Sequence, residues 1–230
     1  MKLYETKKLH YRKFLYRLSI HNQLSSFFRT EFQKPGKLGY VRKKIDELHT
    51  KWLPHLDQIE HRWGPHNRFV DYIDVADYYD AIEIYRILYN SDDYKIRVES
   101  NMLHLYSNDR SLMQQLINKT KAGYKEFYEP NPEHIELLLN TDNVILVQNP
   151  PKYEYKITLG KHRGSPELAK WARANPNLCK MGAATLQENE HKSYMSGLYF
   201  YVRDSKALLI AQMMVGHNIQ RVEKLVYIEQ

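Results

Sequence analysis

The hydrophobic period of this 230-residue chain changes near Tyr94, and this change constrains the fold more than any motif. Before Tyr94, apolar residues recur at helical steps, which predicts helices over 2–33, 40–52 and 71–89. After it, apolar and polar residues alternate, which is typical of strands. We expect strands at 94–99, 102–106, 144–148, 153–159, 198–202 and 222–228. The sequence therefore predicts an α+β fold, in which a helical N-terminal region precedes one or two small mixed sheets.

The second half of the chain also carries helix start signals between its strands. Asp109, Ser165 and Asp204 are expected to cap helices that run to about residues 119, 175 and 215. When Asp109 is aligned with Asp204, residues 103–109 match 198–204, and each stretch leads into an apolar helix. A Tyr-Lys-Ile strand precedes each stretch, at 94–96 and 155–157, and a strand follows each helix.

These matches predict two strand–strand–helix–strand units, 94–148 and 152–230, within a domain of residues 91–230 that follows a basic helical region of residues 1–90. The alternative is a chance match between two common supersecondary units.

The net positive charge of +7 is concentrated at the N-terminus. Residues 1–50 hold 12 Lys and Arg against four acids, whereas the remaining residues hold 22 against 23. Such an asymmetry indicates a polyanionic partner, and DNA or RNA is the leading hypothesis. Alternatives are a solvated basic face on a docked helix and an anionic membrane surface. The residues predicted to contact phosphates are Lys7, Lys8, Arg12, Lys13, Arg42, Lys43 and Lys44.

A second basic segment, residues 160–165, holds three potentially cationic side chains between two glycines, just ahead of a predicted helix. A helix start presents free N–H groups, so Lys161, Arg163 and Ser165 are candidates for binding a phosphate. The segment matches no known nucleotide-binding fingerprint, and a solvated turn with a capping serine is the alternative.

Acidic residues recur every three positions along the predicted helix of residues 71–89, at Asp71, Asp74, Asp77 and Asp80. Clustered carboxylates can hold Mg²⁺, so a metal-dependent nuclease that uses Asp71, Asp74 and Asp77 is the competing enzyme hypothesis. The same acids would otherwise form a solvated helix face or pair with the basic N-terminal residues. Outside the nuclease hypothesis we expect no cofactor and no metal.

Several function classes are excluded by composition. The single Cys179 excludes an intramolecular disulfide and any multi-cysteine zinc site, so His134-Ile135-Glu136 cannot belong to a zinc deaminase. No apolar run reaches transmembrane length and no signal peptide is evident, which predicts an intracellular, cytoplasmic location. Small size and high Tyr and Asn content favour a viral or phage accessory protein, which would then occupy the host cytoplasm.

The leading hypothesis is a noncatalytic nucleic-acid-binding accessory protein. The alternatives are the nuclease and a protein-interaction or assembly component.

Overall fold

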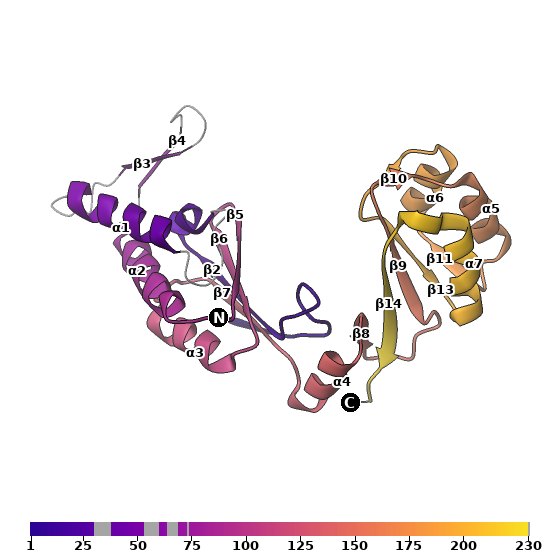
Figure 1. The fold of residues 1–230 in the computed structure, drawn as a ribbon, viewed down its shortest axis with the longest axis horizontal. Helices are drawn as coiled ribbons and strands as arrows, with labels where there is room; N and C mark the ends of the chain where they lie inside the picture. The colour runs from indigo at the N-terminus through magenta and orange to yellow at the C-terminus, as the bar shows by residue number, and fades with distance from the viewer. Residues whose placement is uncertain (30–37, 53–59, 64–68, 73, 230) are drawn as a thin grey trace. The chain divides into compact units, whose positions relative to one another are not determined.

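The computed structural model describes residues 1–29, 38–52, 60–63, 69–72 and 74–229. The chain forms two compact units, Met1–Glu136 and Leu137–Gln230 (Figure 1). Each unit contains a five-stranded mixed sheet with helices, so the predicted α+β class is confirmed. The units divide at Glu136, whereas the sequence predicted a basic helical region that ends near residue 90.

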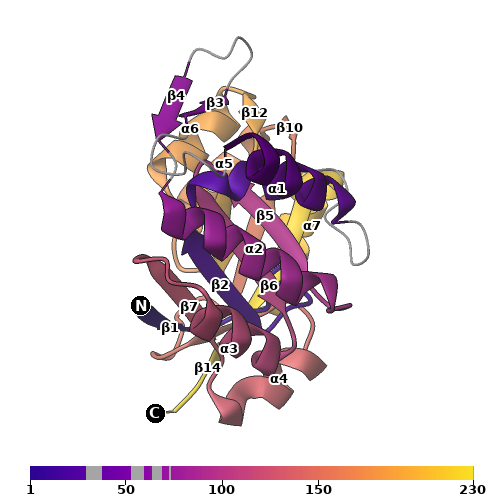
Figure 2. The ribbon, with the colours of Figure 1, turned by 90° about the vertical axis from the view of Figure 1, so that its left-hand side faces the viewer.

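The sheet of the first unit has the order β1-β7-β2-β6-β5. β1 runs parallel to β7, and every other neighbouring pair is antiparallel. Helices α2 (Val75–Tyr89) and α3 (Arg110–Lys119) lie on one face of this sheet. Figure 2 shows them in front of the strands of the sheet. The strands are β1 (Lys2–Glu5), β2 (Tyr16–His21), β5 (Lys95–Glu99), β6 (Met102–Ser107) and β7 (Lys125–Glu129).

Further elements lie between β2 and α2 in the described part of the chain. They are the 3-10 helix η1 (Gln23–Phe28), helix α1 (Gly39–Trp52) and a separate hairpin of β3 (Glu60–Trp63) and β4 (Phe69–Tyr72). α1 packs near α2 and η1. Because alternate strand residues face opposite sides, the fully buried Leu18, Ile20 and Leu105 face the helices. Their neighbours Arg17, Ser19 and Tyr106 therefore lie on the other face.

The sheet of the second unit has the order β11-β13-β9-β14-β8. Its core gathers Ile157, Phe200 and Val202 of the sheet with Leu168 of α5 (Pro166–Ala174) and Ala211 of α7 (Ser205–Val215). The strands are β8 (Val144–Val147), β9 (Tyr155–Leu159), β11 (Cys179–Met181), β13 (Tyr199–Val202) and β14 (Ile219–Tyr227). Smaller elements complete the described chain: η3 (Pro132–His134), α4 (Ile135–Asn140), β10 (His162–Arg163), α6 (Ala183–Glu190), β12 (Tyr194–Met195) and η4 (Gly216–Asn218).

The two sheets have the same topology. In chain order, β1, β2, β5, β6 and β7 occupy the positions of β8, β9, β11, β13 and β14, and every neighbouring pair has the same direction. In each unit a strand–helix–strand connection passes over a central strand, β2 or β9, which is the split β-α-β arrangement. The match of Asp109 with Asp204 therefore joins equivalent elements, since these residues cap α3 and α7.

The match between the two Tyr-Lys-Ile stretches, in contrast, joins strands that are not equivalent. β5 lies at the edge of its sheet, whereas β9 lies in the centre of the other, so the counterpart of β9 is β2. The sequence comparison missed β2 because residues 2–33 were expected to form one helix.

That expected N-terminal helix is wrong for the residues that the structure describes. Residues 2–29 form β1, β2 and η1, and positive φ angles at Tyr11 and Arg12 turn the chain between the two strands. Leu18 and Ile20 are completely buried at alternate positions of a strand held between β6 and β7. Apolar spacing along this segment fitted a helix, but the segment is stabilised by pairing with strands about 90 residues away. Residues 30–33 and the expected stop at Pro35-Gly36 lie outside the described residues.

Candidate nucleic-acid interface

The basic residues predicted to contact phosphates come from two elements of the first unit. Lys7, Lys8, Arg12 and Lys13 lie in the loop that joins β1 to β2, and the others lie on α1. In this loop Arg12 and Lys13 are exposed, and Lys13 Nζ lies 2.8 Å from Asp93 Oδ1 in a solvent-exposed ion pair. Such a pair contributes roughly 0–1 kcal/mol, so it leaves Lys13 available to a phosphate.

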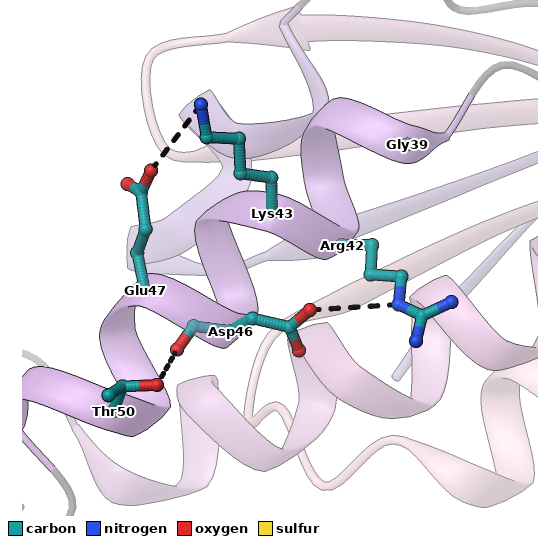
Figure 3. A pocket seen from close by; sticks show the side chains of 6 residues that line it. All are labelled: Gly39, Arg42, Lys43, Asp46, Glu47 and Thr50. Atoms are coloured by element: carbon teal, nitrogen blue, oxygen red, sulfur yellow. Dashed lines mark hydrogen bonds and ion pairs between the residues drawn. The ribbon is translucent and has the colours of Figure 1, made fainter.

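On α1 each of the three predicted contact residues, Arg42, Lys43 and Lys44, pairs with an acid about one turn further along the helix. Arg42 Nε lies 3.6 Å from Asp46 Oδ2, and Lys44 Nζ lies 3.0 Å from Glu47 Oε2. Lys43 Nζ lies 4.0 Å from Oε1 of the same Glu47. Arg42, Lys43, Asp46 and Glu47 line an open pocket on α1, together with Gly39 and Thr50 (Figure 3). The two acids compensate much of the positive charge of α1, so we rank α1 below the β1–β2 loop as an anion-binding surface.

The division of the chain into units changes the distribution of charge. The first unit has 22 Lys and Arg against 19 Asp and Glu, a net charge of +3, because the basic N-terminus folds together with an acidic stretch. The second unit has 12 against eight, a net charge of +4. A net positive charge is therefore a property of both units rather than of the N-terminus alone.

The segment of residues 160–165 has the geometry of a capped turn. Ser165 caps α5, since its Oγ accepts from Leu168 N at 3.2 Å and donates to Glu167 Oε2 at 3.1 Å. Hydrogen bonds from the backbone and from Ser165 hold the pKa of the Glu167 carboxyl below its usual range, so a negative charge already occupies the helix start. Lys161 and Arg163 are exposed and available to a phosphate, but the N-terminus of the helix is satisfied internally.

The acidic residues that recur every three positions between Asp71 and Asp80 are here called the acidic ladder. Those whose side chains the structure describes accept hydrogen bonds from backbone amides of the first unit. Asp74 caps α2 by accepting from Ala76 N, and Asp77 Oδ2 accepts from Gln23 N, each at 2.8 Å. The buried Asp80 accepts from Lys121 N and Ala122 N at 2.7–2.9 Å. Burial also raises the pKa of the Asp77 carboxyl above its usual value. These acids therefore anchor the loops that flank the sheet.

The remaining member of the predicted nuclease site, Asp71, lies in β4, and its side chain lies outside the described residues. Among the side chains that the structure describes, no group of three or more His, Cys, Asp or Glu could hold a metal ion. The nuclease hypothesis therefore gains no support from the geometry of Asp74 and Asp77.

Sequence reasoning missed the most distinctive surface of the first unit, the face of its sheet opposite α2 and α3. We call it the first aromatic face. Tyr4 and Tyr128 stack there with ring centroids 4.7 Å apart, and the Arg17 guanidinium lies 3.8 Å from the centre of the Tyr128 ring. The pairing of the strands aligns Lys95, Tyr106, Arg17, Tyr128 and Tyr4 in one row across the sheet. A band of rings and cations thus crosses this face.

The β1–β2 loop folds over part of this band. Tyr11 meets the edge of Tyr106 at 4.9 Å, and Lys95 Nζ lies 4.0 Å from the centre of the Tyr11 ring. Arg97 Nη1 donates to the Tyr11 hydroxyl at 3.4 Å. The loop leaves Tyr106 only 5% exposed, whereas Tyr4 and Tyr11 remain 40% and 45% exposed. Exposed rings and the basic loop residues are thereby brought onto one surface.

The positive charges on this face at pH 7 come from Arg and Lys. Burial, with Arg17 and Lys8 nearby, lowers the pKa of His10 to about 4, and burial lowers the pKa of His104. Both imidazoles are therefore neutral at pH 7. Two carboxylates share the face, Glu126 at 3.5 Å from Arg17 Nη2 and Glu99 paired with Arg97. The signal that could have revealed this surface is the alternation within residues 16–21, which places Arg17 opposite Leu18.

Comparisons with protein-family models, curated proteins and solved structures found no match to this chain. Among the described residues, no helix is both long and apolar enough to cross a membrane.

Proposed function

We propose that this protein binds nucleic acid without cleaving it. In this proposal the first aromatic face contacts bases, and the adjoining β1–β2 loop contacts phosphates. The observation that carries the proposal is the close association of rings with cations on the helix-free face of a sheet. Arg17 lies over Tyr128 and Lys95 over Tyr11, and the loop that holds Tyr11 also holds Lys8, Arg12 and Lys13.

Each component of this surface suits one part of a nucleic acid. Tyrosine rings stack on bases with little sequence preference, at about 1–3 kcal/mol per base. Lysine and arginine neutralise phosphates and release counterions, which supplies affinity for any sequence. A sheet face presents rings at regular spacing on a rigid frame, so the cost of ordering the site is paid during folding. Arg42, Lys43, Lys44, Lys161 and Arg163 would add secondary phosphate contacts.

The test is a fluorescence polarisation titration of the full chain with labelled 20-nucleotide dT, rU and duplex probes over a range of salt concentrations. We expect log K to fall linearly with log salt. Replacing Lys8, Arg12 and Lys13 with Gln should reduce the slope by roughly 2, since each phosphate contact on a single strand contributes about 0.7. A matched control replaces Lys170, Lys192 and Lys206, three exposed lysines of the second unit outside its sheet, with Gln.

Two results would contradict the proposal. One is an absence of binding to every probe at low salt. The other is an equal loss of slope in the control variant, because net charge alone would then explain the affinity. Incubation with Mg²⁺ or Mn²⁺ checks that the nucleic acid stays intact. If it were cleaved, Asp74→Asn is the informative variant, because Asn preserves the helix cap while removing the carboxylate.

One observation favours the protein-interaction alternative. The outer side of α7 exposes Leu209, Ile210 and Met213, and clustered apolar side chains on a surface mark interaction sites. Self-association through this helix would survive high salt, unlike phosphate contacts. Sedimentation equilibrium in high salt tests it, with Met213→Lys expected to restore a monomer. Deleting residues 1–33 would not be a fair test, because it removes β1 and the central strand β2.

A further inference from the structure

The second sheet packs Ile157, Phe200 and Val202 against α5 and α7, so the residues that alternate with them lie on the opposite face, which we call the second aromatic face. This face repeats the side-chain pattern of the first aromatic face. In the first unit, Tyr106 lies between Lys95 of β5 and Arg17 of β2. In the second unit, Tyr201 lies between Lys180 of β11 and Lys156 of β9, at the equivalent positions of the sheet. Each tyrosine is therefore flanked by two cations across neighbouring strands.

The agreement extends to the next position on the same strands. Two residues before each tyrosine, His104 faces Ser19 of β2, and Tyr199 faces Thr158 of β9. The residue between them is completely buried against the helices in both units, as Leu105 and as Phe200. The registers thus give the face of each sheet that points away from the helices the same two features. One is a tyrosine between two cations, and the other is an aromatic ring, of His104 or Tyr199, that faces a hydroxyl side chain on the neighbouring strand.

The second face differs in how much of its aromatic surface is presented. Tyr106 is covered by the β1–β2 loop, whereas Tyr199 is 45% exposed and Tyr201 is partly exposed. The Tyr199 and Tyr201 rings meet edge to face at 5.6 Å, and Lys156 Nζ lies 4.2 Å from the centre of the Tyr199 ring. The exposed Tyr199 ring is therefore held in place by contacts with Lys156 and Tyr201.

The charges on this face are mixed but favour an anion at its surface. Lys180 is exposed and Lys156 partly exposed. Glu223 of β14 faces Lys156 across the strands, is only 3% exposed and lies 3.3 Å from Arg221 Nε. Glu154, two residues before Lys156, is exposed. The residues that flank Tyr201 directly are nevertheless two lysines at least partly accessible to solvent, Lys156 and Lys180, and these complement a phosphate backbone.

We infer that the second unit carries its own binding site for single-stranded nucleic acid on this face, with Tyr199 stacking on a base and Lys156 and Lys180 contacting the flanking phosphates. The inference rests on the proposed function and adds a second, separate site to it. A single strand is required because stacking on a side chain needs an unpaired base whose face is free. A duplex would offer only its backbone to the two lysines.

The test uses the full chain and labelled 20-nucleotide dT and rU, with a duplex of the same length. Tyr199→Ala should weaken single-strand binding by about 5-fold or more, the expected loss of one stacked base. Lys156→Gln should weaken binding and reduce its salt slope. Tyr194→Ala is the matched control, because Tyr194 is 73% exposed in the same unit but belongs to the separate β10–β12 pair. Photocrosslinking of a 4-thiothymidine strand should label the peptide that contains Tyr199 and Tyr201.

The outcomes separate this inference from the proposed function. If the wild-type chain binds no probe, both fail. If it binds while Tyr199→Ala and Lys156→Gln bind as tightly as wild type and no label appears in residues 199–201, the second site is overturned and the proposed function stands. An equal effect of Tyr194→Ala, or equal weakening of duplex and single-strand binding by Tyr199→Ala, would also overturn it. Near-ultraviolet circular dichroism confirms that each variant is folded.

Discussion

Replacement of Asp80 by Ala tests whether the acidic ladder anchors the fold. The Asp80 carboxylate projects from α2 and accepts the backbone N–H groups of Lys121 and Ala122, which connect α3 to β7. The residue is 2% exposed, and the three hydrogen bonds are partly buried. The variant leaves two amides without this acceptor and detaches the loop from α2. We therefore expect the first unit to lose stability without any involvement of metal.

The magnitude follows from the number and kind of bonds lost. A hydrogen bond to a charged group contributes about 1.5–3 kcal/mol, and two donors lose such a bond. Lys121 is exposed and Ala122 half-buried, so water can partly replace the carboxylate. We expect a loss of about 2–4 kcal/mol from the free energy of unfolding of the first unit. Asp80→Asn should cost less, because the amide oxygen can still accept.

Urea denaturation followed by circular dichroism measures this loss, analysed as two transitions because the chain has two compact units. Glu83→Ala is the matched control, since it removes an acid from the same helix whose partner, Arg86, lies in an exposed ion pair. We expect that change to cost at most about 0.5 kcal/mol. The reasoning is refuted if Asp80→Ala costs no more than Glu83→Ala. The acids of the ladder would then not be needed for stability, and a metal-binding role would again be a candidate.

Two further predictions concern the loop over the first aromatic face and the turn before α5. The pKa of His10 is lowered to about 4, below the ordinary value of 6.5, so the unfolded chain takes up a proton first as the pH falls. The free energy of unfolding should therefore fall between pH 6.5 and pH 4. In urea titrations at pH 7 and 4.5, His10→Phe should remove about 1–2 kcal/mol of that fall. If the difference in stability between wild type and His10→Phe did not change with pH, the buried position of the ring would be contradicted. Gly164→Ala should lower the free energy of unfolding of the second unit by about 2 kcal/mol or more, because its Cβ would lie 2.6 Å from Asn189 Cα. A Cβ added at Gly182 meets nothing within 4 Å, so Gly182→Ala is the control and should cost little. Equal thermal midpoints for the two variants would disprove the close approach at Gly164.

Several strands and three helices after Tyr94 could be predicted because their signals are local, whereas β7, β11 and α6 were not expected from the sequence. Asp109, Ser165 and Asp204 accept hydrogen bonds from amides within three residues, so a short stretch of sequence contains both the cap and the start of the helix. The alternation in β5, β6, β9 and β13 needed no knowledge of a partner strand. β1 and β2 were missed because their apolar spacing also fits a helix and the deciding contacts lie far away in the sequence.

The candidate site was predictable only in part. The sequence identified Lys8, Arg12 and Lys13 as accessible cations, but it could not show that Tyr11 from the same loop lies against Lys95 and Arg97. The sequence marked the two glycines around residues 161–163 but could not show that Gly164 makes room for the backbone of α6. Both contacts were out of reach of local reasoning, since the neighbours concerned lie 24 or more residues away.

The sequence by itself determined the α+β class, the capped helices and an excess of positive charge, because periodicity, capping and composition act within a few residues. Only the tertiary structure decided that the acids of α2 hold backbone amides 41 and 54 residues away, and that both sheets align a tyrosine between two cations. Strand order and register place side chains on a face, and both arise from long-range pairing that no local pattern encodes. The shared topology of the two units, and with it the second aromatic face, became visible through that pairing.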